Sequence, residues 1–262
     1  MPNRSDVAEA LGVKIYFDAV ETSARVEINR RLVQQVFHDA DGARGVLTTH
    51  RPDAVEQLVW HVAAHEVGHA IYNLANLAGA MSQPAYESLL EEPRAELTAM
   101  FTLQLLHRQG VLTRDALDTA LAHFALDGLR YFDKYASAPL RPYIIFQVYA
   151  YKVYARHGYL TLHPTSGKLV LDASKTLDCL ASFADCFERL LTCMDESDAA
   201  GLEAILFDEL APEDAFVRAT TALVAATKAA AGAAPPPPRP ERSCSCHPTW
   251  SLPLCQVCLP TA

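Results

Sequence analysis

The sequence predicts a mainly α-helical α+β fold, and three observations support this prediction. Apolar residues recur at helical spacing through most segments between the turns. Strand-like patterns are confined to four short segments. With 262 residues, of which 50% are hydrophobic and 20% charged, the chain has ordinary globular composition. This length suits one large domain or two small ones.

The N-terminal 50 residues predict a short α+β segment. Residues 14–19 and 24–28 alternate apolar with polar side chains and contain β-branched residues, which favours two short strands. A helix is expected from about residue 30 to residue 37, followed by a turn centred on Asp41 and Gly42.

Two longer helices are expected next. Asp53 and Glu56 have the spacing of a capped helix start, and the apolar pattern continues past Ala70. A loop over residues 79–84 then leads into a second helical pattern, which ends near Gly110.

The rest of the chain predicts further helices and one β-hairpin. The hairpin joins residues 159–163 to residues 168–172 through Pro-Thr-Ser-Gly, a sequence typical of a turn. The helices are expected over residues 114–129, 143–156, 174–194, 198–206 and 213–231.

The charge balance argues against two classes of partner. The chain has 22 Lys and Arg against 31 Asp and Glu, a formal charge of −9. It therefore offers no basic surface to nucleic acid or to an acidic membrane. No apolar run reaches the roughly 18–20 residues of a spanning helix, and residues 1–12 lack the apolar stretch of a secretory signal. We expect a cytoplasmic protein.

Cysteines divide into two groups. Three lie seven residues apart on one helical stripe and are expected to be buried reduced thiols: Cys179, Cys186 and Cys193. Four follow a Pro-rich stretch after residue 233 and could close a small structural zinc site: Cys244, Cys246, Cys255 and Cys258. We favour the alternative, that residues 233–262 form a flexible tail with incidental cysteines.

The sequence His-Glu-Val-Gly-His at residues 65–69 has the HExxH form. On a helix, His65 and His69 share a face and can reach one zinc ion, while Glu66 can take a proton from water beside it. His61 lies on the same side. It stands about 12 Å from His69 along the axis, too far to share the ion, so packing or a contact with the site's surroundings is expected.

A third ligand is expected from Glu-Glu-Pro-Arg-Ala-Glu at residues 91–96. Three neighbouring glutamates repel one another, and a bound dication would relieve that repulsion. Pro93 leaves two alternatives open. Either the helix continues through it, or the helix begins there with Glu92 as its cap, in which case Glu92 and Glu96 do not share a face.

The two motifs together resemble those of the dipeptidyl peptidase III family of zinc metallopeptidases, in which a HExxGH or HExxH element precedes an EExRAE or EExRAD element. Softer similarity continues to about residue 210. The resemblance implies a zincin-like, gluzincin-type catalytic domain, which we place at residues 51–232. It implies one catalytic zinc ion, with residue roles as follows: ligands His65, His69 and Glu92; general base Glu66; and Glu91 and Glu96 as carboxylates supporting the ligands.

Only 64 residues precede His65, whereas family members usually carry a long segment there that builds a second lobe. The chain thus resembles the catalytic half, and homo-oligomerisation is one way to complete the cleft. The family's catalytic histidine has no clear counterpart, and Arg141 stands near its place; Arg141 and Tyr143 are the candidates for oxyanion or substrate contacts. The expected function is zinc-dependent cleavage of short peptides or small amides. The alternatives are a zinc enzyme for a non-peptide small molecule and a catalytically silent zinc-stabilised binding protein.

Overall fold

The structure, a computed structural model, describes residues 24, 32–38, 53–74, 84–134, 141–210 and 214–233. The strands predicted at residues 14–19 and 24–28 lie outside these ranges except for Ala24, which is helical and not extended as predicted. The four tail cysteines also lie outside. The predicted helix at residues 30–37 is helical over residues 32–36 and then reaches the bridging residue Phe37.

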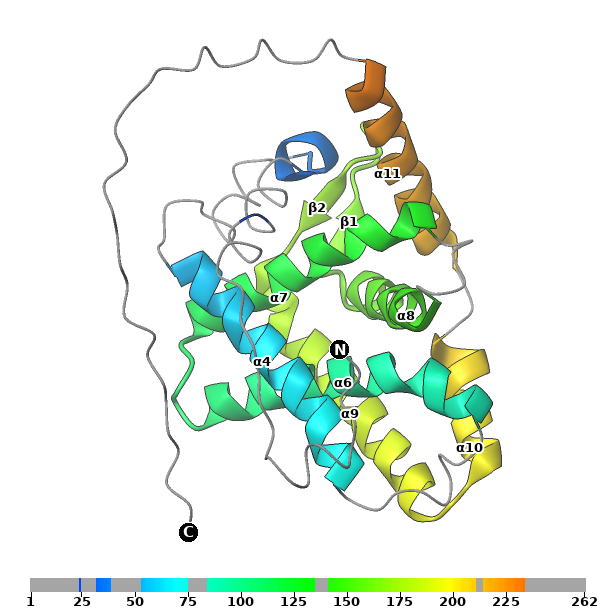
Figure 1. Cartoon of the computed structure of the whole chain (residues 1–262). Helices are drawn as coiled ribbons and strands as arrows, with labels where there is room; N and C mark the ends of the chain where they lie inside the picture. The colour runs from blue at the N-terminus through cyan, green and yellow to red at the C-terminus, as the bar shows by residue number, and fades with distance from the viewer. Residues whose placement is uncertain are drawn as a thin grey trace, which may run out of the picture.

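The described chain is mainly helical with one two-stranded sheet, which confirms the predicted fold class (Figure 1). In chain order the elements are α4 (Asp53–Leu74), α6 (Pro84–Arg108), α7 (Arg114–Gly128), η1 (Leu129–Lys134), α8 (Arg141–His157), β1 (Leu160–Leu162), β2 (Leu169–Leu171), η3 (Ala173–Lys175), α9 (Thr176–Asp195), α10 (Ala199–Glu203), η4 (Ala204–Leu210) and α11 (Ala215–Ala233). The helix predicted at residues 198–206 is thus the short α10 followed by the π-helical η4. No described helix is both long and apolar enough to cross a membrane.

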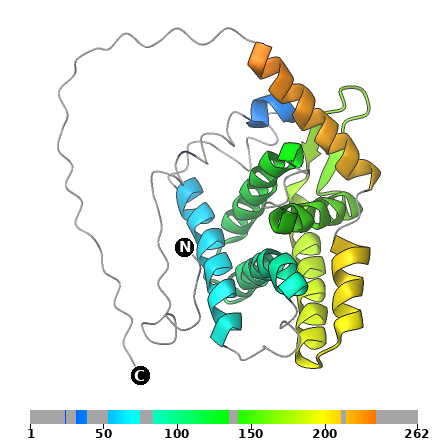
Figure 2. The ribbon, with the colours of Figure 1, turned by 45° about the vertical axis from the view of Figure 1, so that its right-hand side comes forward.

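Helix α6 lies at the centre of the packing. It contacts α4 on one side and α8 and α9 on others, and α7 packs across α4 (Figure 2). Helices α6, α7, α8 and α9 contribute large side chains that are almost completely buried, among them Leu97, Met100, Phe124, Phe146 and Phe183. Burying one such side chain contributes about 1.5–3 kcal/mol, so this core holds α4 and α6 at a fixed distance.

The predicted hairpin is present. Strands β1 and β2 pair antiparallel, with Leu160 opposite Leu171, and the intervening turn is closed by a bond from the Gly167 N–H to the His163 carbonyl of 2.9 Å. Phe37 adds a parallel bridge to Leu169. This bridge anchors residues 32–38 on the hairpin, although the two segments are far apart in the sequence.

Pro93 lies inside α6, so the alternative in which a helix begins at Pro93 is wrong. A proline in a helix interior removes one backbone hydrogen bond and costs about 3 kcal/mol or more. Complete burial of the neighbouring Leu90, Ala95 and Leu97 offsets that cost. Because the helix is continuous, Glu92 and Glu96 lie four residues apart on one face.

Gly68 sets how closely α4 approaches α6. A Cβ atom at Gly68 would lie 2.9 Å from the Thr98 Cβ, 3.0 Å from the Ala95 Cα and 3.1 Å from the Ala95 carbonyl oxygen. These contacts are at or near the limit that real Cβ atoms show, so any side chain at this position would force α4 and α6 to move apart. The glycine of the HExxH motif therefore serves the helix crossing that brings histidines and glutamates together.

We expect Gly68→Ala to lower the free energy of unfolding by about 1–2 kcal/mol. Overpacking costs about 1–3 kcal/mol, and the helix propensity of alanine recovers up to about 1 kcal/mol. Urea denaturation of the metal-free protein measures the change. A Gly68→Ala protein as stable as the wild type would contradict the close crossing.

Candidate metal centre

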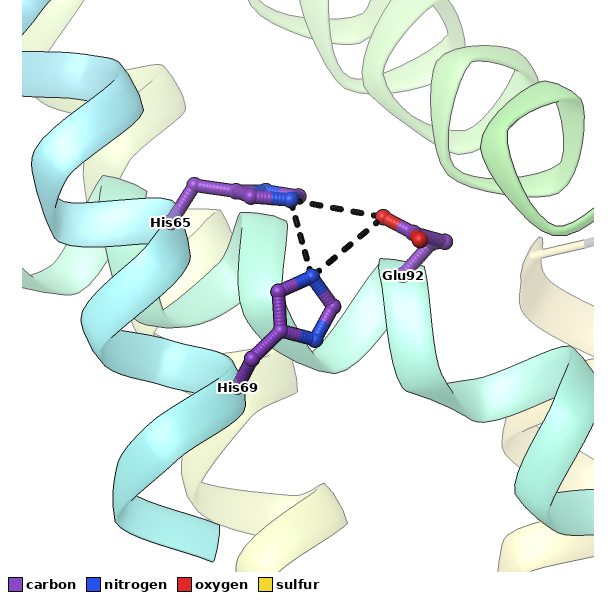
Figure 3. A group of neighbouring side chains, drawn as sticks. All are labelled: His65, His69 and Glu92. Atoms are coloured by element: carbon purple, nitrogen blue, oxygen red, sulfur yellow. Dashed lines mark hydrogen bonds and ion pairs between the residues drawn. The ribbon is translucent and has the colours of Figure 1, made fainter. Parts of the chain in front are cut away.

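Three predicted ligands converge between α4 and α6 (Figure 3). His65 and His69 lie one turn apart on α4, and their Nε2 atoms are 3.0 Å apart. Glu92 reaches them from α6, with its Oε2 atom 3.3 Å from the His65 Nε2 and 3.6 Å from the His69 Nε2. These three atoms form a small triangle of ligand types that bind divalent transition metals.

The triangle has the dimensions of one face of a tetrahedral zinc site. Atoms bound about 2.0–2.1 Å from a tetrahedral zinc ion lie about 3.3–3.4 Å from one another. The three distances here bracket that value. The Glu92 Oε2 atom is buried and accepts no hydrogen bond of regular geometry within the described part of the chain. The residues therefore fit a zinc ion held by three protein atoms, with a fourth position left for water or substrate.

His69 is oriented by a second carboxylate. Its Nδ1 atom lies 2.7 Å from the Glu91 Oε1, and the Glu91 Oε2 lies 3.3 Å from the Arg94 Nη2. A carboxylate at Nδ1 accepts the ring N–H there, which leaves the Nε2 lone pair free to face the triangle. Glu91 thus contacts the ring of one predicted ligand, and Arg94 supplies the counter-charge.

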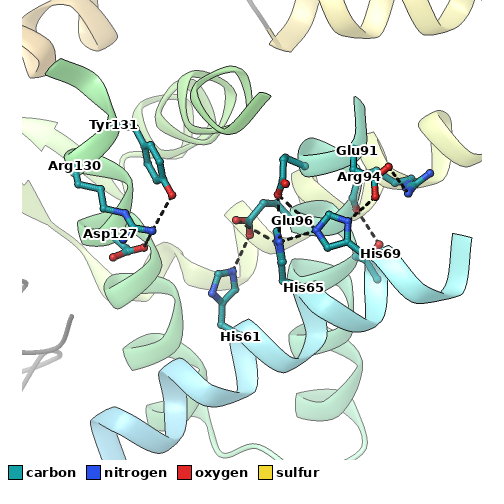
Figure 4. Close-up of polar contacts among 11 residues, drawn as sticks. His61, His65, His69, Glu91, Arg94, Glu96, Asp127, Arg130 and Tyr131 are labelled. Atoms are coloured by element: carbon teal, nitrogen blue, oxygen red, sulfur yellow. Dashed lines mark hydrogen bonds and ion pairs between the residues drawn. The ribbon is translucent and has the colours of Figure 1, made fainter. Parts of the chain in front are cut away.

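Glu96 of α6 lies beside both His65 and His61 (Figure 4). The His65 Nδ1 lies 3.4 Å from the Glu96 Oε1. The other oxygen of Glu96 lies 2.9 Å from the Nε2 of His61, one turn earlier on α4. Glu96 and His61 are both buried. Residues at intervals of four on α4 therefore face residues at the same interval on α6.

The Tyr143 hydroxyl interacts with the Glu92 carboxylate, and this interaction lowers the pKa of Glu92 and raises the pKa of Tyr143. Tyr143 stacks on Tyr131, with parallel rings whose centroids are 5.7 Å apart. The Arg130 Nη2 donates to the Tyr131 hydroxyl over 2.8 Å and lies 3.0 Å from the Asp127 Oδ2. Sequence reasoning missed Tyr131, Arg130 and Asp127, because nothing in their spacing ties η1 and the end of α7 to the motif.

The remaining predicted site residues differ in placement. Glu66 is partly buried on α4 between the two histidines in sequence, and its charge acts on the Tyr143 hydroxyl. Arg141 is exposed at the first position of α8. Three tyrosines that follow Tyr143 in the sequence are completely buried and belong to the core: Tyr151, Tyr154 and Tyr159.

The cluster creates a strong negative field. Burial lowers the pKa of His65, but the Glu96 and Glu92 carboxylates outweigh it and raise the pKa to about 10. Burial likewise lowers the pKa of His69, but hydrogen bonding to Glu91 and Glu92 raises it to about 9. Burial raises the pKa of Glu92, yet the two histidines and Tyr143 lower it to about 2. A site that attracts protons this strongly also attracts a dication.

The pKa values of two carboxylates beside the ligands, Glu91 and Glu96, shift in the same direction as the pKa of Glu92. Burial opposes ionisation, but His69 and Arg94 hold the pKa of Glu91 below its usual value. The charge of His65 and the contact with His61 likewise lower the pKa of Glu96, against a large burial effect. Three carboxylates are therefore ionised at neutral pH around the triangle.

Comparisons with known proteins agree with this geometry at the level of fold. No protein-family model matches the sequence, and a search of curated proteins finds no match. Among solved structures, DPP III from Caldithrix abyssi matches with a TM-score of 0.64 and 16% sequence identity. The match covers 86% of this chain and 41% of that one, so this chain corresponds to less than half of the neighbour's length. The neighbour supports the predicted zincin-like fold.

We expect the metal-free protein to lose stability as pH rises from about 6.5 through 9–10. The folded-state pKa of His65 and His69 is raised to about 10 and 9, so their contribution is complete below the ordinary histidine value and disappears as they deprotonate. On the acid side, stability falls as pH drops below about 4.5 towards 2, because the pKa of Glu92 is lowered to about 2.

Urea denaturation across pH 5–10 in the presence of a chelator measures the alkaline change. The double variant His65→Gln/His69→Gln is the control and should show little of it. An alkaline stability profile identical in the two proteins would contradict the proposed charge pairing.

Proposed function

We propose that this protein is a zinc-dependent hydrolase that cleaves short peptides or small amides. The observation that carries the proposal is the convergence of two imidazole nitrogens and one buried carboxylate oxygen at zinc-like spacing. Glu66 next to the first histidine supplies a base. The structural likeness to DPP III supports the same reaction class.

A bound zinc ion supplies Lewis acidity towards a carbonyl group and lowers the pKa of water. His65, His69 and Glu92 would hold it, in the tautomers that Glu96 and Glu91 fix. Glu66 takes a proton from the attacking water and returns it to the leaving amine. This division of roles follows from the helix: residues 65 and 69 share a face, and residue 66 lies a step around it.

Tyr143 and Arg141 have different proposed roles. The Tyr143 hydroxyl interacts with Glu92 and lies within the field of Glu66, so it stands beside the reacting atoms. It keeps Glu92 aimed at the triangle in the free protein, and its single O–H can turn to a developing oxyanion when a substrate is bound. Arg141 is exposed at the start of α8, where it can contact the rest of a substrate.

The substrate is proposed to be small. The matched region spans 41% of DPP III from Caldithrix abyssi, so most of that chain has no counterpart among the matched residues. We propose that a second copy of this chain or another partner covers the open side of the site when the substrate is a peptide. A small amide needs no such cover.

We expect Glu66→Gln to lower the hydrolytic rate by about 10²–10⁴-fold with zinc content unchanged, because it removes the base and keeps the side-chain shape. His65→Ala and Glu92→Ala should each lose about one zinc per chain. Elemental analysis and a panel of dipeptidyl-arylamides, other amides and esters measure both properties. Full activity in Glu66→Gln would refute the mechanism. A zinc-loaded wild type that hydrolyses nothing would favour the silent binding protein.

We expect Tyr143→Phe to weaken zinc binding by about 10-fold, since the loss of an outer hydrogen bond to a ligand typically costs 10–100-fold. The phenyl ring keeps the stack on Tyr131. A chelator competition assay measures the affinity. Tyr149→Phe is the control, because its hydroxyl bonds to the Ser182 carbonyl on α9, away from the triangle. Equal affinity in wild type and Tyr143→Phe would contradict the role of this hydroxyl.

A further inference from the structure

We propose that His61 is a positioning residue for zinc binding, which acts on the metal through Glu96 and His65. This inference rests on the zinc site of the proposed function. It adds a role for His61 of α4, which acts through Glu96 of α6. His61 is 7% exposed and sits two helical turns before His69. That separation, about 12 Å, keeps its ring from binding the same ion.

Glu96 divides its two oxygens between two imidazoles. Its Oε2 lies 2.9 Å from the His61 Nε2, a short hydrogen bond, and its Oε1 lies 3.4 Å from the His65 Nδ1, a longer contact. If the Glu96 carboxylate rotates towards one histidine, its distance to the other histidine also changes. The His61 bond therefore decides which way Glu96 faces His65.

The surroundings of His61 fix its role as a donor. Its Nδ1 atom is buried and has no hydrogen-bond partner among the described residues. The ring packs on Phe124 of α7, with centroids 4.7 Å apart. Burying an unpaired N–H group costs more free energy than burying an unprotonated ring nitrogen. The proton therefore lies on Nε2 and is donated to Glu96.

The consequence reaches the metal through His65. With one oxygen occupied by His61, Glu96 holds the other 3.4 Å from the His65 Nδ1, an ion-pair contact that is longer than the His61 hydrogen bond. The His65 Nε2 lone pair then points at the triangle in the metal-binding tautomer. Without the His61 donor, a buried carboxylate has one oxygen unsatisfied and is free to rotate away from His65. Neither the His61–Glu96 contact nor the Glu96–His65 contact involves Glu66. We therefore expect the loss of the His61 donor to change the zinc affinity.

Two substitutions in the full chain separate donation from packing. His61→Phe keeps a ring against Phe124 and removes the donor. His61→Gln carries an amide N–H at about the reach of Nε2. We expect His61→Phe to raise the zinc dissociation constant 10–100-fold and His61→Gln to stay within about 3-fold of wild type. Competition with a chromophoric chelator measures both, and urea denaturation of the metal-free proteins shows that both are folded.

The coupling is tested in a Glu96→Gln background, where His61→Phe should cost no further affinity because the carboxylate it positions is gone. His107→Phe is the control for replacing a histidine by phenylalanine. His107 lies in the last turn of α6, where it bonds to the Leu112 carbonyl and not to Glu96. Wild-type affinity in His61→Phe, or a His61→Gln as weak as His61→Phe, overturns the inference alone. A wild type that binds no zinc overturns the metal centre as well.

Discussion

The close crossing of α4 and α6 is the constraint on which the rest of the site depends. Gly68 packs against the backbone at Ala95, and this contact fixes the two helices near enough for side chains of ordinary length to meet between them. At that distance, histidines at intervals of four residues face glutamates at the same interval. A wider separation would take the histidine partners on α4 away from the buried Glu96 and from the partly buried Glu91 and Glu92, which is unfavourable because charged groups that are removed from water need such partners.

Each of the three ligands has its own supporting contacts, and these come from different parts of the chain. His69 is held by Glu91 with Arg94, and His65 by Glu96 with His61. Glu92 is held by Tyr143 of α8, with Tyr131 stacked behind it. Since each support fixes one donor or acceptor, the atoms left over are those that point inward. A preorganised triangle of this kind binds a dication without first rearranging.

Local patterns account for what the sequence could predict. The helices, the hairpin turn and the ligand types follow from periodicity and from a spacing of four residues. Long-range contacts were not predictable. Continuation of α6 through Pro93 depends on the burial of its flanks, and the arrival of Tyr131, Arg130 and Asp127 depends on how η1 packs. The sequence shows Gly68 within the motif, but its role in the helix crossing follows only from its closeness to the backbone of α6.

The central claim is that one zinc ion sits among the His65 Nε2, the His69 Nε2 and the Glu92 Oε2. Anomalous X-ray diffraction from crystals of the zinc-loaded protein tests it most directly. The account predicts a single strong peak about 2.0–2.2 Å from all three atoms. A peak elsewhere on the chain, with these three side chains pointing apart, would contradict it.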